Sequence, residues 1–137
     1  MLEKLYGDGL AITRFVESEI RTGAANLPKL QVGLDAIAAG RLRVVDDVSP
    51  EELATMQALP PKFSAADKTN IAVAGHRKWT LLTDERAMLA ECGRRTIATL
   101  RTEDVLREAV QAGILKQDDL PGIADEMAQK AKYRPQI

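Results

Sequence analysis

Three acidic residues lie where the sequence predicts that strands end and helices begin. Asp84 directly follows a predicted strand over residues 79–83, and Asp67 lies in the first turn of a predicted helix. Glu19 follows the first predicted strand and, at about 100° per residue, falls within the apolar arc of its helix. Ligand sites in open α/β sheets lie beyond the carboxyl ends of the strands, and carboxylates suit Mg²⁺ or Mn²⁺. These positions are therefore compatible with a divalent metal site, where an ion would offset the charge of a buried carboxylate.

Each of these carboxylates also has a purely structural explanation. Asp84 would serve as the N-cap of the helix that follows it. Asp67 is the third residue after Ser64, so the two would form a capping box. Glu19 would pair with an arginine on its own helix or keep its carboxylate in water. The residue types alone leave both alternatives open.

The remaining reactive side chains favour structural roles. His76 is the one histidine and lies at the predicted end of a helix beside Arg77, where a cation suits the helix C-terminus. Cys92 is the one cysteine and lies on an apolar helical stretch, which favours packing over nucleophilic chemistry. A glycine-rich phosphate loop of either common pattern does not occur. Carboxylate chemistry is therefore the main catalytic possibility.

Short apolar runs alternate with helical stretches along the chain. Four runs predict buried strands, at residues 10–13, 42–46, 79–83 and 96–99. Cap signals predict helices that begin after Ser49 and Ser64 and a helix capped by Thr102 that ends at Gly113. Further helices are predicted over Leu27–Ala39 and from Pro121 toward Lys130, and residues 2–7 resemble the end of a helix. This order predicts an α/β fold, a three-layer α/β/α sandwich around a mostly parallel sheet.

Composition limits the class of protein. The 137 residues correspond to one domain over 1–137, with a loose C-terminal tail over 132–137. Lys and Arg number 19 and Asp and Glu number 20, which excludes a strongly basic nucleic-acid-binding chain. A single cysteine excludes a disulfide framework and a multi-thiolate zinc site. The absence of a long apolar run predicts a cytoplasmic protein without a membrane segment.

Several segments resemble a PIN domain in their order and spacing. The segments are Phe63-Ser-Ala-Ala-Asp-Lys-Thr-Asn-Ile-Ala-Val-Ala74, then Leu81-Leu-Thr-Asp-Glu-Arg86, and then the run 96–99. Upstream, Leu10-Ala-Ile-Thr-Arg-Phe-Val-Glu-Ser-Glu-Ile20 is similar to the family's strand followed by a helix with a Val-x-x-Glu-[Leu/Ile] motif. Residues 105–115 resemble the family's C-terminal helix. The resemblance covers residues 5 to 125.

The resemblance implies a metal-dependent ribonuclease, commonly the toxin of a toxin–antitoxin pair. It implies that Glu19, Asp67 and Asp84 are catalytic residues and hold Mg²⁺ or Mn²⁺, with Glu85 as a weaker extra candidate. The implied partners are an RNA substrate, an antitoxin protein and a second copy in a homodimer. Phosphate contacts would come from basic residues that also suit solvated helix faces, namely Arg14, Lys68, Arg86, Arg94 and Arg95.

One departure from the PIN pattern is large. The family opens with a central strand that carries the first metal-binding aspartate, and no segment before Leu10 matches it. Asp8, in a Gly-Asp-Gly turn, is a poor substitute. We expect the natural start to lie upstream of Met1; the alternatives are a non-catalytic PIN-like or generic α/β interaction module, or a strand supplied by a second copy. The two functional alternatives are thus a ribonuclease and a binding module.

Overall fold

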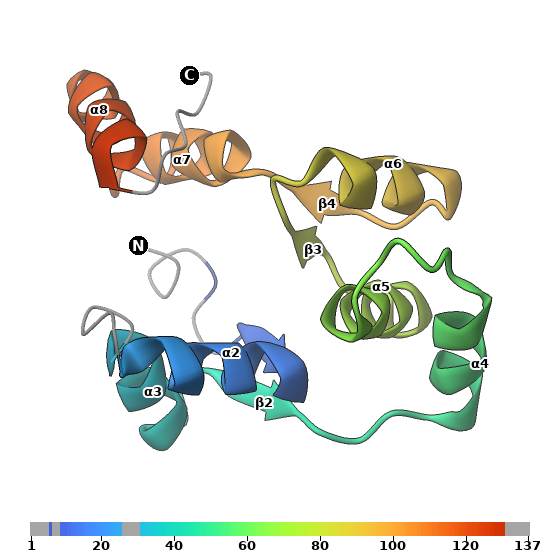
Figure 1. Cartoon of the computed structure of the whole chain (residues 1–137). Coiled ribbons are helices and arrows are strands. Elements are labelled where there is room, and N and C mark those ends of the chain that lie inside the picture. The colour runs from blue at the N-terminus through green and yellow to red at the C-terminus, as the bar shows by residue number, and fades with distance from the viewer. Residues whose placement is uncertain (1–5, 7–8, 26–30, 131–137) are drawn as a thin grey trace.

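The computed structural model describes Tyr6 and residues 9–25 and 31–130. Three predicted features lie outside the described residues. They are the helix end over residues 2–7, of which only Tyr6 is described, the start of the helix Leu27–Ala39, and the tail over 132–137. Figure 1 shows the chain as a set of helices joined by very short strands.

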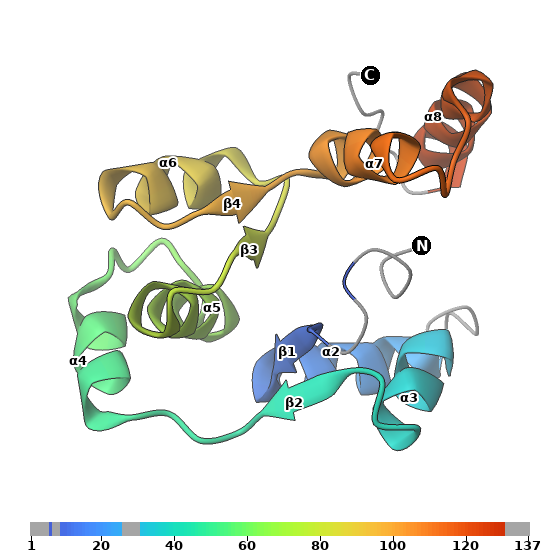
Figure 2. The ribbon, with the colours of Figure 1, turned by 180° about the vertical axis from the view of Figure 1, so that it is seen from behind.

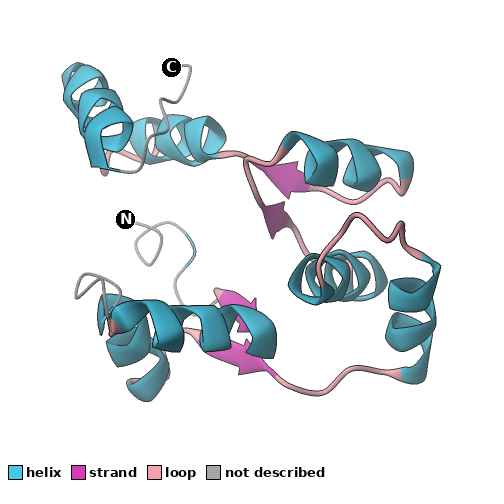
Figure 3. Ribbon diagram, in the orientation of Figure 1, coloured by secondary structure: helices cyan, strands magenta, loops and turns pink. Residues whose placement is uncertain are grey.

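The described elements alternate between strands and helices, as Figure 3 shows by colour. The first half contains β1 (Ala11–Thr13), α2 (Arg14–Ala24), α3 (Gln31–Ala38), β2 (Arg43–Val45) and α4 (Pro50–Ala58). The second half contains α5 (Ala65–Arg77), β3 (Leu81–Leu82), α6 (Arg86–Arg94), β4 (Thr99–Leu100), α7 (Thr102–Gln111), the 3₁₀ helix η2 (Gln117–Asp119) and α8 (Leu120–Lys130). No helix in these described ranges is long and apolar enough to span a membrane.

The strands form two separate pairs. β1 pairs in parallel with β2, in the register Ala11 to Arg43, and β3 pairs in parallel with β4, in the register Leu81 to Thr99. Each strand therefore has one hydrogen-bonded neighbour within the described part of the chain. The α/β class is confirmed, whereas a three-layer sandwich around one central sheet is not.

Helix α5 packs against a strand of each pair, β1 and β3, and Figures 1 and 2 show it from opposite sides. It contacts α4, α6, β1 and β3, and its residues Ile71–Ala74 are buried. Ile71 packs with Leu59, Phe63, Met88 and Cys92 in a buried hydrophobic cluster. The core thus surrounds a helix rather than a sheet, because two short strand pairs offer little face to cover.

The predicted helix starts at Ser49 and Ser64 are confirmed. The Glu52 amide donates to the Ser49 hydroxyl at 3.1 Å, and the Ser49 amide donates to the Glu52 carboxylate at 2.9 Å. Ser64 and Asp67 form the same reciprocal pair. The predicted cap at Thr102 is wrong by one residue, because Arg101 is the N-cap of α7. The fourth strand also starts later than predicted, because Thr96, with a φ of 58°, ends α6.

Candidate functional site

Asp84 connects the end of β3 to the start of α7. Its Oδ1 accepts a hydrogen bond from the Thr102 amide at 2.8 Å, and its Oδ2 accepts one from the Thr102 hydroxyl at 2.5 Å. The N-cap of α6 is Glu85, whose side chain makes no capping hydrogen bond. The N-cap role expected for Asp84 is therefore wrong, and the carboxylate caps the more distant helix instead.

Asp67 and Glu19 occupy ordinary helical positions. Asp67 is half-buried and accepts the Ser64 amide in the capping box at 3.3 Å. Glu19 is exposed on α2, so its predicted place in a buried arc is wrong. The reason is that α2 is only partly covered: none of its residues is buried, and even the apolar Phe15 is 43% exposed.

The described residues hold no metal-binding cluster. Within them, no group of three or more His, Cys, Asp or Glu side chains could hold a metal ion. Asp84 and Asp67 instead hold helix starts through their own hydrogen bonds. The side chains as placed here therefore do not fit the Mg²⁺ or Mn²⁺ that the resemblance implies.

Two of the basic residues expected to contact phosphate, together with His76 and Cys92, also have contacts within the chain. Arg94 and Arg95 both donate to Glu91, at 2.8 and 3.0 Å, and Arg94 contributes most to lowering the pKa of this carboxylate. His76 Nε2 lies 2.7 Å from the Thr55 hydroxyl. Cys92 is fully buried, as predicted, and burial raises the pKa of its thiol.

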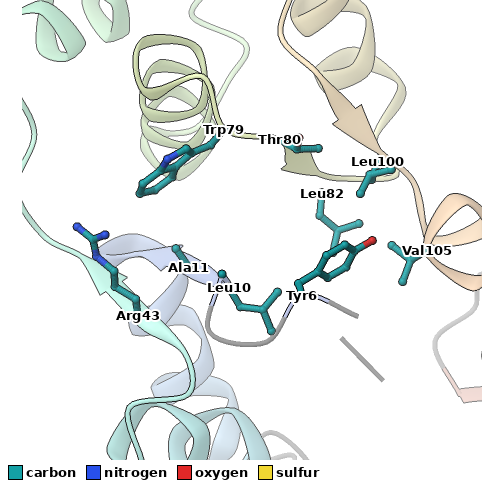
Figure 4. A pocket seen from close by; sticks show the side chains of 10 residues that line it. Tyr6, Leu10, Ala11, Arg43, Trp79, Thr80, Leu82, Leu100 and Val105 are labelled. Carbon is teal, nitrogen blue, oxygen red and sulfur yellow. The ribbon is translucent and has the colours of Figure 1, made fainter. Parts of the chain in front are cut away.

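A cavity of about 440 Å³ lies between the two strand pairs, and we call it the intersheet cavity. Figure 4 shows one wall formed by residues of the β1–β2 pair and the other by residues of the β3–β4 pair and α7. Its lining is mainly apolar: Tyr6, Gly9, Leu10, Ala11, Arg43, Trp79, Thr80, Leu82, Leu100 and Val105. A smaller hollow of about 70 Å³ shares Ala11, Trp79 and Thr80 and continues toward Thr13 and Asn70. The Thr13 hydroxyl donates to the Asn70 side chain there at 2.9 Å.

Among the described residues, β1 and β3 each have one edge without a paired strand, and residues of both strands line this cavity. The Arg43 amide donates to the Leu10 carbonyl, so the strand alternation turns the N–H and C=O of Ala11 away from β2. The amides of Leu81 and Thr83 donate to β4, so those of Thr80 and Leu82 face away from β4. Ala11, Thr80 and Leu82 all line the intersheet cavity. Two strand edges therefore face one hollow.

Cation–π and ionic contacts surround Trp79, which lines the intersheet cavity. The guanidinium groups of Arg77 and Arg43 lie 5.3 and 5.7 Å from the centre of the Trp79 ring. Arg77 also donates to the buried Glu52 carboxylate at 2.9 Å, and this hydrogen bond lowers the pKa of Glu52. The Trp79 ring is thus in contact with two cations, and one of them, Arg77, is paired with a buried carboxylate.

Tyr6 forms another part of the cavity lining. Its hydroxyl donates to the Glu108 carboxylate of α7. Burial, followed by this hydrogen bond, raises the pKa of Tyr6 to about 12. The contact joins the segment before β1 to a helix about a hundred residues later in the chain.

Comparison with known proteins identifies no relative. No protein-family model matches the chain, and neither a curated protein nor a solved structure matches it. Sequence reasoning missed the intersheet cavity, because its walls come from segments about seventy residues apart. The available signal was the single tryptophan directly before an apolar strand.

Proposed function

We propose that this chain is a non-catalytic α/β interaction module that binds another polypeptide through the intersheet cavity. The observation that carries this proposal is that β1 and β3 each have an edge with no paired strand in the described part of the chain, and that residues of both strands line one apolar cavity. Unpaired strand edges are templates for pairing with another chain. The hydrogen bonds of Asp67 and Asp84 support the same view, since both side chains have structural work at helix starts.

A metal-dependent ribonuclease of the PIN type is the second candidate. The placement of Asp84 favours it, because this exposed carboxylate lies two residues after the end of β3, where sites of α/β sheets lie. In that proposal RNA is the substrate, Mg²⁺ or Mn²⁺ is the cofactor, a further strand completes a three-layer sandwich and the protein acts in the cytoplasm. An antitoxin or a second copy would be its partner.

A thermal-shift titration with MgCl₂ and MnCl₂ separates the two candidates. The proteins compared are the wild type, Asp84→Asn and the control Asp118→Asn, which changes an exposed aspartate in η2. A metal at one hundred times its Kd would stabilise the native state by about 2.7 kcal/mol, or roughly 8 °C in a chain of this size.

The interaction module predicts that metal shifts the melting temperature of all three proteins equally or not at all. Asp84→Asn itself should cost about 0.5–1 kcal/mol, because an amide oxygen still accepts from the Thr102 amide. A metal-dependent stabilisation that is present in the wild type and Asp118→Asn but lost in Asp84→Asn would overturn the proposal in favour of the ribonuclease.

A further inference from the structure

Charge and apolar surface lie at opposite ends of the intersheet cavity. Figure 4 shows Arg43 and Trp79 at one end. Leu82, Leu100 and Val105 lie at the other, which we call the apolar end. Among the described residues that line the cavity, Arg43 carries the only formal charge. The cavity therefore has one cationic end and one apolar end, and its volume of about 440 Å³ is typical of small-molecule sites.

The Arg43 guanidinium is available to an anion. Arg43 is exposed, and its guanidinium lies 5.7 Å from the centre of the Trp79 ring. Within the described ranges no carboxylate forms an ion pair with Arg43, whereas Arg77, the second cation near this ring, is paired with Glu52. A guanidinium carries five N–H donors in a planar fork that matches the two oxygens of a carboxylate. Arg43 can therefore bind a carboxylate without breaking an ion pair of the described chain.

From this arrangement we infer that the intersheet cavity binds a small carboxylic acid with an apolar chain, whose carboxylate pairs with Arg43 and whose chain covers the apolar end. Charge at the far wall gives the same orientation. The Tyr6 hydroxyl donates there to the carboxylate of Glu108, and this negative charge repels a second carboxylate. The inference goes beyond the proposed function and does not rest on it, since a small acid is a second ligand that would exclude a polypeptide from the cavity.

The two parts of the ligand contribute to binding in different ways. Leu82 is 47% exposed although it belongs to a strand, so an apolar chain has surface to cover. Each further methylene that the ligand buries should tighten binding about fourfold. A carboxylate costs more to remove from water than a hydroxyl does, so a cavity without a cation would prefer a neutral alcohol. Preference for the acid over the alcohol is therefore the signature of Arg43.

The test measures binding of decanoate, octanoate and 1-decanol to the whole chain by isothermal titration calorimetry. Octanoate, which is two methylenes shorter, should bind about tenfold more weakly than decanoate. Decanol should bind about fivefold more weakly, the effect of one solvated ion pair. NMR locates the ligand, because decanoate should shift the amide signals of Ala11, Thr80 and Leu82, which line the cavity. Emission of Trp79, the only tryptophan, should move to shorter wavelength as the ligand displaces water.

Two variants, each with a matched control, separate the two ends of the cavity. Arg43→Gln should weaken decanoate about fivefold and leave decanol unchanged. Its control is Arg86→Gln, which changes an exposed arginine of α6 outside the lining. Leu82→Ala should weaken both ligands about fivefold, because it removes apolar surface that either chain covers. Its control is Leu53→Ala on α4, where the leucine is 48% exposed and does not line the cavity.

Three outcomes would overturn the inference. Decanol that binds the wild type as tightly as decanoate would show that no cation selects the ligand, and this comparison decides even if Arg43→Gln fails to fold. Equal effects of Arg43→Gln and Arg86→Gln would assign the preference to general surface charge. Unsaturated binding at millimolar decanoate, or shifts confined to residues outside the lining, would show that the cavity is not the site. None of these results depends on metal, so the metal titration judges the interaction module separately.

Discussion

Glu52 is a buried carboxylate with two structural tasks. Its side chain is 2% exposed, accepts the Ser49 amide at the start of α4 and accepts the Arg77 guanidinium at the end of α5. Arg77 in turn lies over the Trp79 ring. One residue of α4 therefore fixes the wall of the intersheet cavity through Arg77.

We expect Glu52→Gln to lower the free energy of unfolding by about 2–4 kcal/mol at pH 7. The amide still accepts the Ser49 amide, but Arg77 loses its buried counter-charge. Urea unfolding followed by circular dichroism measures the change. Glu51→Gln, an exposed neighbour in the same turn, should change stability by less than about 0.5 kcal/mol.

The same pair of proteins gives a pH dependence with a defined sign. Because the pKa of Glu52 is lowered in the folded state, its stabilising contribution is present above the ordinary carboxyl pKa and is lost as the pH falls through the folded value. The stability difference between wild type and Glu52→Gln should therefore shrink below about pH 4. A difference that is constant from pH 7 to pH 3 would show that the charge of Glu52 does not carry the effect.

At the scale of elements, two helices end in backbone conformations that their residues disfavour. Lys78 at the end of α5 and Thr96 at the end of α6 have φ angles of 56° and 58°. The Trp79 amide then donates to Ala74, and the Ile97 amide donates to Cys92, in the pattern of a left-handed helix C-cap. The left-handed conformation costs about 1–2 kcal/mol for a residue with a Cβ, and it suits a β-branched threonine least.

We expect Thr96→Gly to raise the free energy of unfolding by about 1 kcal/mol. Thr96 is exposed, so the change removes strain without removing buried contacts. Thr99→Gly, in the extended backbone of β4, is the control and should destabilise the protein by about 0.5–1 kcal/mol. If Thr96→Gly destabilised the protein as much as the control does, the left-handed assignment at Thr96 would be wrong. Thermal denaturation of both variants measures the difference.

Helix starts that depend on side chains close together in the chain were predictable from the sequence. The capping boxes at Ser49 and Ser64 depend on side chains three residues apart, and both form as predicted. Strands were located to within a few residues, since apolar runs mark them, but β4 starts later than predicted because Thr96 belongs to the turn after α6. The predicted burial of Glu19 was wrong for another reason. Helical periodicity indicates which face of a helix is apolar, whereas the tertiary structure decides whether that face is covered.

At the scale of the whole molecule, the sequence pattern could not predict which strands pair with each other. Alternating strands and helices predict one parallel sheet, whereas β1 and β3 stay apart and enclose a cavity. The structure also contains contacts between residues far apart in the chain, such as Tyr6 with Glu108, which a local sequence pattern does not predict. The predicted acidic site also depends on how distant segments pack together. The sequence therefore identified three candidate carboxylates, but it could not show whether they lie close to one another.

The central claim is that no strand of the described ranges pairs with the inner edges of β1 and β3, and hydrogen exchange of the free chain tests it most directly. We predict slower exchange for the amides of Arg43, Leu81 and Thr83, which donate to Leu10, Ala98 and Leu100. The amides of Ala11 and Leu82 should exchange at least about tenfold faster than these. Equal protection of both sets in a monomer would contradict the account, because the two edges would then already be paired.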